Sequence, residues 1–425
     1  MKNKFIKNTI ILIIGGFITK VFGMLIKIIM TRNISTYSMS LYTLTLPTYN
    51  LFITIVTLSM TISISKLVSE NNIKKEKIMS SSLFISIIIS IISAIIMLIF
   101  VKPITMLLHN DKLYYPLLSI ILSLPFISIS TCIRGYFFGK NKMIVQVVSN
   151  LFEQLSRIIL FIIILPKIQN EIQAVSFIIG SNMISEIISI FTMSLFLPKR
   201  KIRLSKPDKE VTNEILKISI PTTAQKLFAV ISYFFEPIIL TNLLLLNGYS
   251  NNYITTEYGI INGYTIQLLM LPSFFTNAIS QVIIPNISNA YTNKKYDYIK
   301  TKIKQVFAIS LIIGIFYTVI VMLKKELIMN LIYNTKEGIK YINILAPVFI
   351  LLYLEGPINS ILQSLNKPKT ILITSIIGII IKYLLMIILS YLKYGIYSFI
   401  IPMLINIIIV VLLNLIKLKK VINSF

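Results

Sequence analysis

Residue types that commonly build metal and disulfide sites are nearly absent from this sequence. The 425 residues include one cysteine, one histidine and no tryptophan. Cys132 alone cannot form an intramolecular disulfide, and together with His109 it supplies too few ligands for a zinc site. We therefore expect no disulfide, no metal and no cofactor.

Charged residues are also scarce, at 13% of the chain against about 25% in soluble domains. Acidic residues are the rarer kind, with 15 Asp and Glu against 41 Lys and Arg and a net charge of +26. Such a basic excess can indicate a nucleic-acid partner. Here the cations lie in short clusters between long apolar runs, which is typical of membrane proteins. We expect a lipid bilayer as partner and no nucleic acid.

Twelve apolar stretches are long enough to cross a membrane as helices, for which about 20 residues suffice. Uninterrupted runs such as Ile85–Ile99 and Ile371–Leu389 argue against the alternation of barrel strands. The stretch after Met1 is too long for a signal peptide and lacks a small-residue cleavage site. The sequence predicts an all-α polytopic membrane protein with spans near residues 8–31, 42–66, 79–101, 114–138, 144–165, 172–197, 215–245, 259–285, 304–323, 338–363, 369–390 and 395–417.

The cations between the spans predict the orientation of the chain. With the N-terminus inside, the inner segments hold 24 Lys and Arg residues and the outer segments hold 9. This bias follows the positive-inside rule, so we expect both termini to be cytoplasmic. The outer segment 324–340 carries four of the nine and is the least consistent with the rule.

A weak internal repeat divides the spans into two halves. The basic segment 199–209 separates six spans from six, and the runs 16–23 and 222–229 carry Lys20 and Lys226 at matching places. Chance similarity between Ile-rich helices is the alternative. Because six is an even number, the halves form a parallel repeat, and transporters bind substrate between such halves. We expect an N-lobe at 1–198, a basic linker at 199–213 and a C-lobe at 214–425.

Two lysines stand on one face of the first span. Lys20 and Lys27 are seven residues apart, so they lie about 20° from alignment on the helix. Two cations on an apolar helix repel each other unless an anion or water lies opposite them. One interpretation is a site for a phosphate-bearing substrate, in which lysine acts as a point charge. The other is that Lys20 pairs with an acidic residue while Lys27 extends to the membrane surface.

Two further patterns involve carboxylates inside spans. Glu153 and Arg157 are four residues apart, which favours a structural ion pair on one helix. Pro237 cannot donate to the carbonyl of Tyr233, so the seventh span is expected to kink beside Glu236. A carboxylate at a broken helix is suited to a coupling cation or to gating, although a plain packing kink is the alternative.

Most of these residues belong to short motifs, and the order of the motifs along the chain is characteristic. Along the chain they are Gly16-Phe17-Ile18-Thr19-Lys20, Ile64-Ser65-Lys66-Leu67-Val68-Ser69-Glu70, Arg134-Gly135-Tyr136-Phe137-Phe138-Gly139, Glu153-Gln154 with Arg157, Glu236-Pro237-Ile238 and Pro285-Asn286-Ile287-Ser288. In this order they resemble the stage V sporulation protein B group. That group belongs to the multidrug/oligosaccharidyl-lipid/polysaccharide (MOP) exporter superfamily and is related to the lipid II flippases.

The resemblance implies two six-helix lobes around a central cavity, working by alternating access in a bacterial plasma membrane. It implies a flippase that moves a polyprenyl-pyrophosphate-linked oligosaccharide from the inner to the outer leaflet. Basic residues of the first span meet the pyrophosphate in related flippases, and Lys20 matches that motif position. We expect Lys27, Lys226 and Arg134 to complete a cationic cavity, and the chain to be a monomer.

Other functions remain open. The chain has no GxxxxGK[ST], G-x-S-x-G or H-E-x-x-H motif, so we expect a transporter with no built-in ATPase, not an enzyme. Protons, sodium ions or the membrane potential would then drive it. A cation-coupled multidrug exporter of the same superfamily would prefer an acidic cavity. A membrane-embedded sugar polymerase or ligase needs a large outer loop, and a wall-assembly scaffold would tolerate loss of Lys20.

Overall fold

The structure, a computed structural model, describes residues 2–70, 73–197 and 206–423, and their side chains except those of residues 2–13, 281, 282 and 285. Within these ranges every regular element is a helix and no strand occurs. The helices pack into two units, Met1–Ile239 and Leu240–Phe425. The boundary between the units falls inside one long helix. The lobe limits expected from the sequence, 1–198 and 214–425, stay a prediction.

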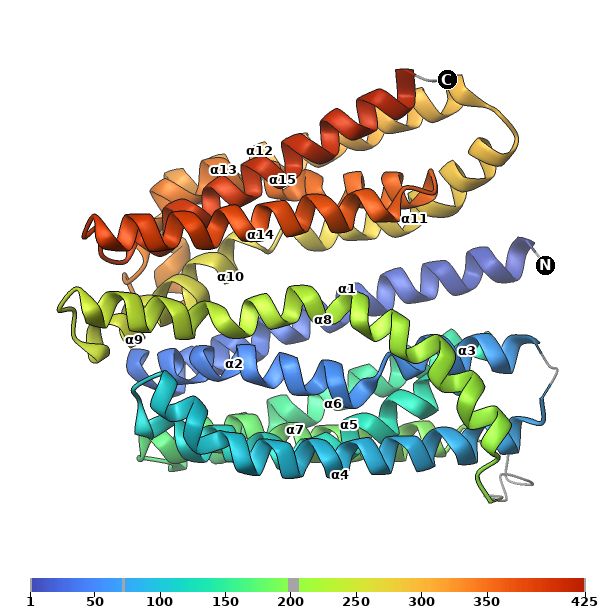
Figure 1. Ribbon diagram of the computed structural model, residues 1–425, viewed down its shortest axis with the longest axis horizontal. Helices are drawn as coiled ribbons and strands as arrows, with labels where there is room; N and C mark the ends of the chain where they lie inside the picture. Colours follow the sequence, from blue (N-terminus) through green and yellow to red (C-terminus); the bar gives the residue numbers. More distant parts are fainter. Residues whose placement is uncertain (1, 71–72, 198–205, 424–425) are drawn as a thin grey trace. The chain divides into compact units, whose positions relative to one another are not determined.

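Unit 1 is a bundle of helices, most of them long (Figure 1). The second predicted span forms two helices, because Leu58 and Ser59 adopt left-handed backbone angles with φ of 41° and 49°. No glycine or proline marks this interruption in the sequence. The helices of unit 1 are α1 (Lys2–Asn33), α2 (Thr36–Thr57), α3 (Met60–Glu70), α4 (Lys75–Leu107), α5 (Tyr114–Gly139), α6 (Met143–Ile164), α7 (Glu171–Ser194) and the first part of α8 (Lys209–Leu246).

Two glycines allow α3 to pack against α5 at backbone distance. A Cβ atom on Gly135 would lie 3.1 Å from the Cα atom of Thr61, and one on Gly139 would lie 2.7 Å from the carbonyl oxygen of Ser65. Larger residues at either position would push the helices apart. Small residues four positions apart are a common device for close helix contact in membranes. The two sequence motifs that contain these residues therefore pack against each other.

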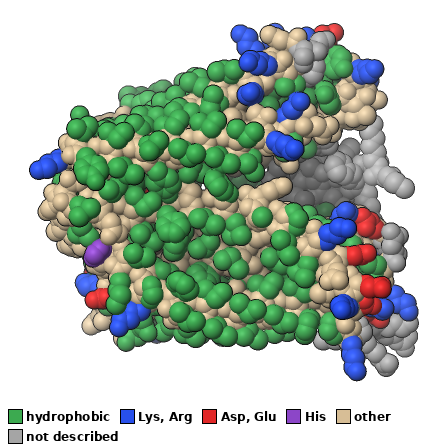
Figure 2. All heavy atoms as spheres, in the orientation of Figure 1, with side chains coloured by type: hydrophobic (Ala, Val, Ile, Leu, Met, Phe, Trp, Pro, Cys, Tyr) green, Lys and Arg blue, Asp and Glu red, His purple; other side chains and the backbone are tan. Residues whose placement is uncertain are grey.

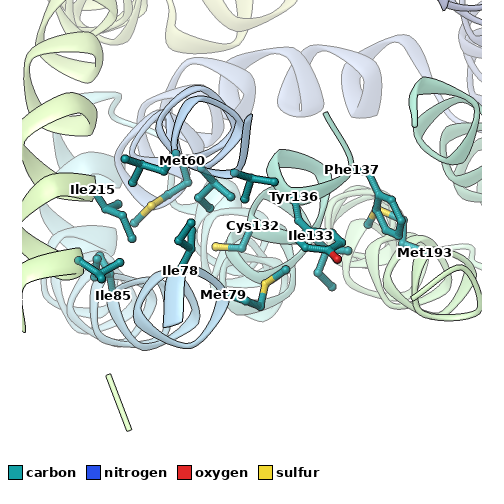
Figure 3. Close-up of a cluster of buried hydrophobic side chains, with 14 of the residues drawn as sticks. Met60, Ile78, Met79, Ile85, Cys132, Ile133, Tyr136, Phe137, Met193 and Ile215 are labelled. Carbon is teal, nitrogen blue, oxygen red and sulfur yellow. The ribbon is translucent and has the colours of Figure 1, made fainter. Parts of the chain in front are cut away.

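The core beside this contact is apolar and contains the single cysteine. Met60, Ile78 and Cys132 meet between α3, α4 and α5 (Figure 3). The Cys132 side chain is 0% exposed, and its sulfur lies 2.8 Å from the Ser86 hydroxyl. A thiol reagent can therefore reach Cys132 only when this part of unit 1 opens.

Asp208 attaches the beginning of α8 to α4. Its carboxylate accepts hydrogen bonds from the backbone N–H groups of Glu210 and Val211, as a helix N-cap does. The same carboxylate lies 2.6 Å from Nζ of Lys77, and this hydrogen bond holds the pKa of Asp208 below its usual value. The backbone N–H of Asp208 also donates to the Ser81 hydroxyl at 3.0 Å.

Unit 2 contains the rest of α8 and the remaining helices. The last part of α12 bends at Lys324 and continues to Tyr333, where the sequence predicted an outer loop. A π-helical turn at Ile260–Thr265 joins the helix Asn251–Gly259 to the helix Ile266–Leu269. The helices are α9 (Asn251–Gly259), α10 (Ile266–Leu269), α11 (Ser273–Thr292), α12 (Tyr296–Tyr333), α13 (Ile339–Ser364), α14 (Pro368–Tyr391) and α15 (Tyr397–Asn423).

The eighth predicted span is broken between α10 and α11, where Pro272 interrupts the helix. Proline has no N–H, so the carbonyl of Leu268 loses its usual helical donor. The carbonyl of Leu269 also loses its usual donor, because the N–H of Ser273 bonds to the carbonyl of Met270 instead. Two tyrosine hydroxyls replace them. Tyr317 donates to Leu268 at 2.8 Å, and Tyr353 donates to Leu269 at 2.6 Å. A membrane span tolerates such a break only where its backbone groups find other partners.

Eleven helical segments in the described part of the chain are long and apolar enough to cross a membrane. They correspond to eleven of the predicted spans, and the twelfth is the span broken at Pro272. Figure 2 shows hydrophobic side chains over the middle of both units, with lysine and arginine gathered near the helix ends. The chain is a multi-pass membrane protein, and the predicted all-α polytopic fold is confirmed.

Candidate functional site

Unit 1 contains a cavity of about 320 Å³ that is bounded by α2, α5, α6 and α7. All four helices are membrane spans, where ionisable residues are costly and usually mark functional sites. A larger hollow of about 490 Å³ beside α5 and α7 has no charged residue in its lining, so we place the site in the smaller cavity. The smaller cavity is lined by Tyr42, Thr45, Leu46, Tyr49, Ile53, Thr57, Ile127, Thr131, Arg134, Glu153, Arg157, Ile179, Asn182 and Glu186.

Arg134 joins three helices around this cavity. Its Nη2 atom donates to Glu153 Oε2 at 2.8 Å and to Glu186 Oε2 at 3.2 Å. The same atom donates to the Ser189 hydroxyl at 3.1 Å, and Ser189 is held by Ser149 at 2.6 Å. One guanidinium on α5 thus connects to α6 and α7 through two carboxylates and a hydroxyl.

Arg157 is held more loosely. Its Nη2 atom lies 3.4 Å from Glu153 Oε1, at the spacing of four residues that the sequence indicated. Its Nε atom is buried and has no hydrogen-bond partner among the described residues. The side chains of Arg134 and Arg157 are 21% and 20% exposed, whereas those of Glu153 and Glu186 are 11% and 10% exposed. The cavity wall therefore contains two arginines and two less exposed carboxylates.

Helix α2 supplies the aromatic wall. Tyr42 and Tyr49 are seven residues apart, so they lie on one face of the helix. Both are close enough to Arg157 for its charge to act on their hydroxyls. On α7, the Asn182 amide donates to the carbonyl of Ile179 at 2.9 Å, which leaves its Oδ1 atom as an acceptor in the lining.

The lysines expected to bind substrate lie on α1 and α8. Lys20 and Lys226 are exposed, and Lys27 is partly buried and close enough to Lys20 for their charges to repel. Among the described residues of unit 1, no carboxylate lies within 4 Å of any of the three. An ion pair at Lys20, one of the two interpretations from the sequence, is therefore not present within this unit.

Glu236 and Pro237 are buried in α8, and the helix continues through both. The kink expected at Pro237 does not interrupt the helix. The bend of α8 lies in its N-terminal half, which contains Pro221 (Figure 1). Tyr233 lies one helical turn before Glu236 on the same helix. Neither Tyr233 nor Glu236 is among the residues that line the cavity.

The structure thus joins Arg134, which the sequence assigned to substrate binding, to the predicted ion pair of Glu153 and Arg157, and adds Glu186. No basic residue stands three or four positions from Glu186 on its own helix, so sequence spacing alone could not identify its partner. The available signal was the cost of a carboxylate inside a span. No cluster of three or more His, Cys, Asp or Glu that could bind a metal ion occurs in the described ranges.

Comparison with known proteins identifies the relatives of this chain. Two family models, both described as polysaccharide biosynthesis protein, match residues 5–291 and 287–424. Stage V sporulation protein B of Bacillus subtilis (strain 168) is 30% identical over 90% of this chain and 77% of its own length. The lipid II flippase MurJ of the same organism is 23% identical over 90% of this chain and 76% of its own length.

A solved structure has the same fold. The inward-facing conformation of a multidrug resistance MATE family transporter of the MOP superfamily has a TM-score of 0.74 at 13% identity. The likeness covers 96% of this chain and 95% of that one. Fold and relatives together define a membrane transporter of the flippase and exporter class, not an enzyme. The chain belongs to the polysaccharide biosynthesis protein family, as the order of its motifs indicated.

Proposed function

We propose that this chain moves a polyprenyl-pyrophosphate-linked oligosaccharide, a precursor of cell wall or polysaccharide, from the inner to the outer leaflet of a bacterial plasma membrane. The observation that carries the proposal is the pair Lys20 and Lys27 on α1. The two cations share a membrane span and lack a carboxylate partner among the described residues of unit 1. The substrate carrier contains a pyrophosphate, which supplies the missing negative charge.

The energetic cost of these lysines favours an anionic ligand. A lysine near the centre of a span costs about 2.5–3.5 kcal/mol on insertion scales, and the mutual repulsion of two adds to it. A bound pyrophosphate offsets that cost, and the cost returns when the pyrophosphate leaves the site. Lys226 on α8 and Arg134 on α5 are the other members of the proposed cationic cavity.

The transport cycle would alternate access between an N-lobe at 1–198 and a C-lobe at 214–425, with both termini in the cytoplasm. Protons, sodium ions or the membrane potential would drive it, because no ATPase motif is present in the sequence. Glu236 is our candidate for binding the coupling ion. The description of the relative MurJ as a lipid II flippase supports lipid II as the first substrate to test.

The test uses bacterial cells depleted of their own lipid II flippase. They would express the wild-type chain, Lys20→Ala or Lys66→Ala, and lipid-linked precursor on the outer leaflet would be measured with a membrane-impermeant sugar reagent. Lys66 is the matched control, because its side chain is 58% exposed beside Glu70 at the end of α3. We expect the wild type and Lys66→Ala to restore exposure, and Lys20→Ala to reduce it about tenfold or more, the effect of losing one charged contact.

Two results would contradict parts of this proposal. Restored exposure that is equal in Lys20→Ala would remove α1 from the substrate site. No restoration, with the chain shown to be in the membrane, would exclude lipid II in that host. The same assay in liposomes with a different lipid-linked glycan would then decide whether another glycan is the substrate.

A further inference from the structure

We propose that the cavity of unit 1 binds one sugar residue of the transported glycan, and that Arg157 recognises a carboxylate on that sugar. The inference rests on the proposed function for its substrate class. It assigns the cavity a role separate from the pyrophosphate contact proposed for Lys20 and Lys27, and it gives Arg157 a binding role instead of a purely structural one.

The size of the cavity fits one sugar. At about 30 Å³ per water molecule in the liquid, the 320 Å³ would hold roughly ten waters. That is enough for a pyranose ring with its substituents and too little for a disaccharide. The rest of the oligosaccharide would have to extend beyond the cavity, so the cavity would contact a single sugar residue of the glycan.

The lining fits the mixed surface of a sugar ring. Tyr42 and Tyr49 offer aromatic faces from α2, and aliphatic side chains of α2, α5 and α7 lie between the polar groups. A pyranose has apolar C–H faces and a polar rim, so both kinds of surface would be used. An isolated phosphate would use only the polar part. The Oδ1 atom of Asn182 is placed to accept from a sugar hydroxyl.

Arg157 makes fewer and longer contacts than Arg134, although the Nε atoms of both are buried without a hydrogen-bond partner among the described residues. Arg134 serves three oxygen acceptors through one nitrogen. Arg157 has a single contact at 3.4 Å, with a buried Nε left without a partner among the described residues. Its planar fork of N–H groups matches a carboxylate in a bidentate manner. The carboxylate side chains of the cluster are about half as exposed as those of the arginines.

The test measures binding of soluble sugars to the purified full chain in lipid nanodiscs. The probes are glucuronate against glucose, N-acetylmuramate against N-acetylglucosamine, and inorganic pyrophosphate. With the usual binding energy per non-hydrogen atom, a sugar acid of about 13 such atoms should bind with a Kd of about 1 mM. We expect each acid to bind about tenfold more tightly than its neutral counterpart.

Variants separate recognition from folding. Arg157→Gln should abolish the preference for the acid, and Arg157→Lys should keep part of it, because the charge remains but the fork is lost. Lys66→Gln removes one exposed cation elsewhere in unit 1 and should leave the preference unchanged. Protection of the buried Cys132 from a thiol reagent shows that each variant is folded.

The inference would be overturned by equal binding of acid and neutral sugars, by a preference that Arg157→Gln leaves intact, or by no sugar binding at tens of millimolar. Pyrophosphate binding that depends on Arg157 while sugars fail would make this a phosphate site. Transport of lipid-linked glycan, measured in parallel, keeps the two proposals apart. A wild type that binds sugar acids but flips no lipid-linked glycan refutes the proposed function alone, and one that flips glycans without the acid preference refutes this inference alone.

Discussion

Replacing Arg134 by glutamine should destabilise unit 1 much more than the same replacement of Arg157. Arg134 is the only cation within 4 Å of Glu186 among the described residues of unit 1, and it also bonds Glu153 at 2.8 Å. Its loss leaves a nearly buried carboxylate unpaired, which costs about 3–5 kcal/mol. Loss of Arg157 removes one long contact of 3.4 Å, and Glu153 keeps Arg134, so we expect about 1 kcal/mol.

The difference of about 2 kcal/mol or more corresponds to roughly 30-fold in the unfolding equilibrium constant. It can be measured by denaturant-induced unfolding of the purified chain in micelles, followed by labelling of Cys132. This thiol is 0% exposed and is the only one in the sequence, so labelling reports the opening of unit 1.

A second variant tests the cause. Arg134→Gln combined with Glu186→Gln removes both the cation and the charge that it neutralises, so about 1–2 kcal/mol should be recovered. Equal destabilisation by the two single arginine variants would refute this reasoning. So would a double variant that is no more stable than Arg134→Gln.

Three further predictions concern the fold. Tyr353→Phe leaves a carbonyl at the break before Pro272 without its hydroxyl donor, which should cost about 0.6–1.7 kcal/mol in denaturant unfolding. Gly139→Ala should cost about 1–3 kcal/mol in the same assay, since its Cβ would lie 2.7 Å from a backbone oxygen of α3. The pKa of Asp208 is lowered by its lysine partner on α4. The stability from this contact is therefore present above the unfolded pKa of about 3.9 and is lost as the pH falls below it. Hydrogen-exchange protection in the first turn of α8 should be unchanged from pH 5 to 8 and should fall below about pH 4.

The two substitutions each have a matched control. Tyr391→Phe changes a side chain that is 74% exposed, and Gly16→Ala adds a Cβ with nothing within 4 Å. Both should stay within about 0.5–1 kcal/mol of the wild type. Loss of protection above pH 5 would contradict the account of Asp208. If Tyr353→Phe matched Tyr391→Phe, or Gly139→Ala matched Gly16→Ala, the corresponding contact would have no energetic role.

Parts of the site were foreseeable from local spacing, and others were not. The separation of four residues between Glu153 and Arg157 places them on one helix face, and their contact at 3.4 Å follows from helix geometry. The contact between Arg134 and Glu186 joins residues 52 positions apart on different helices. No periodicity within one helix determines which helices become neighbours, so the link between these residues needed the structure.

The sequence by itself determined that this is an all-helical membrane protein and where its spans lie. These properties depend on the length and apolarity of each segment, which are local quantities. Only the tertiary structure decided that the second span divides at Leu58, and that Tyr353 bonds a carbonyl 84 residues away. It also decided that the two arginines share one cavity. These features depend on which faces of distant helices meet, because close packing and unsatisfied backbone groups are settled between helices and not within them.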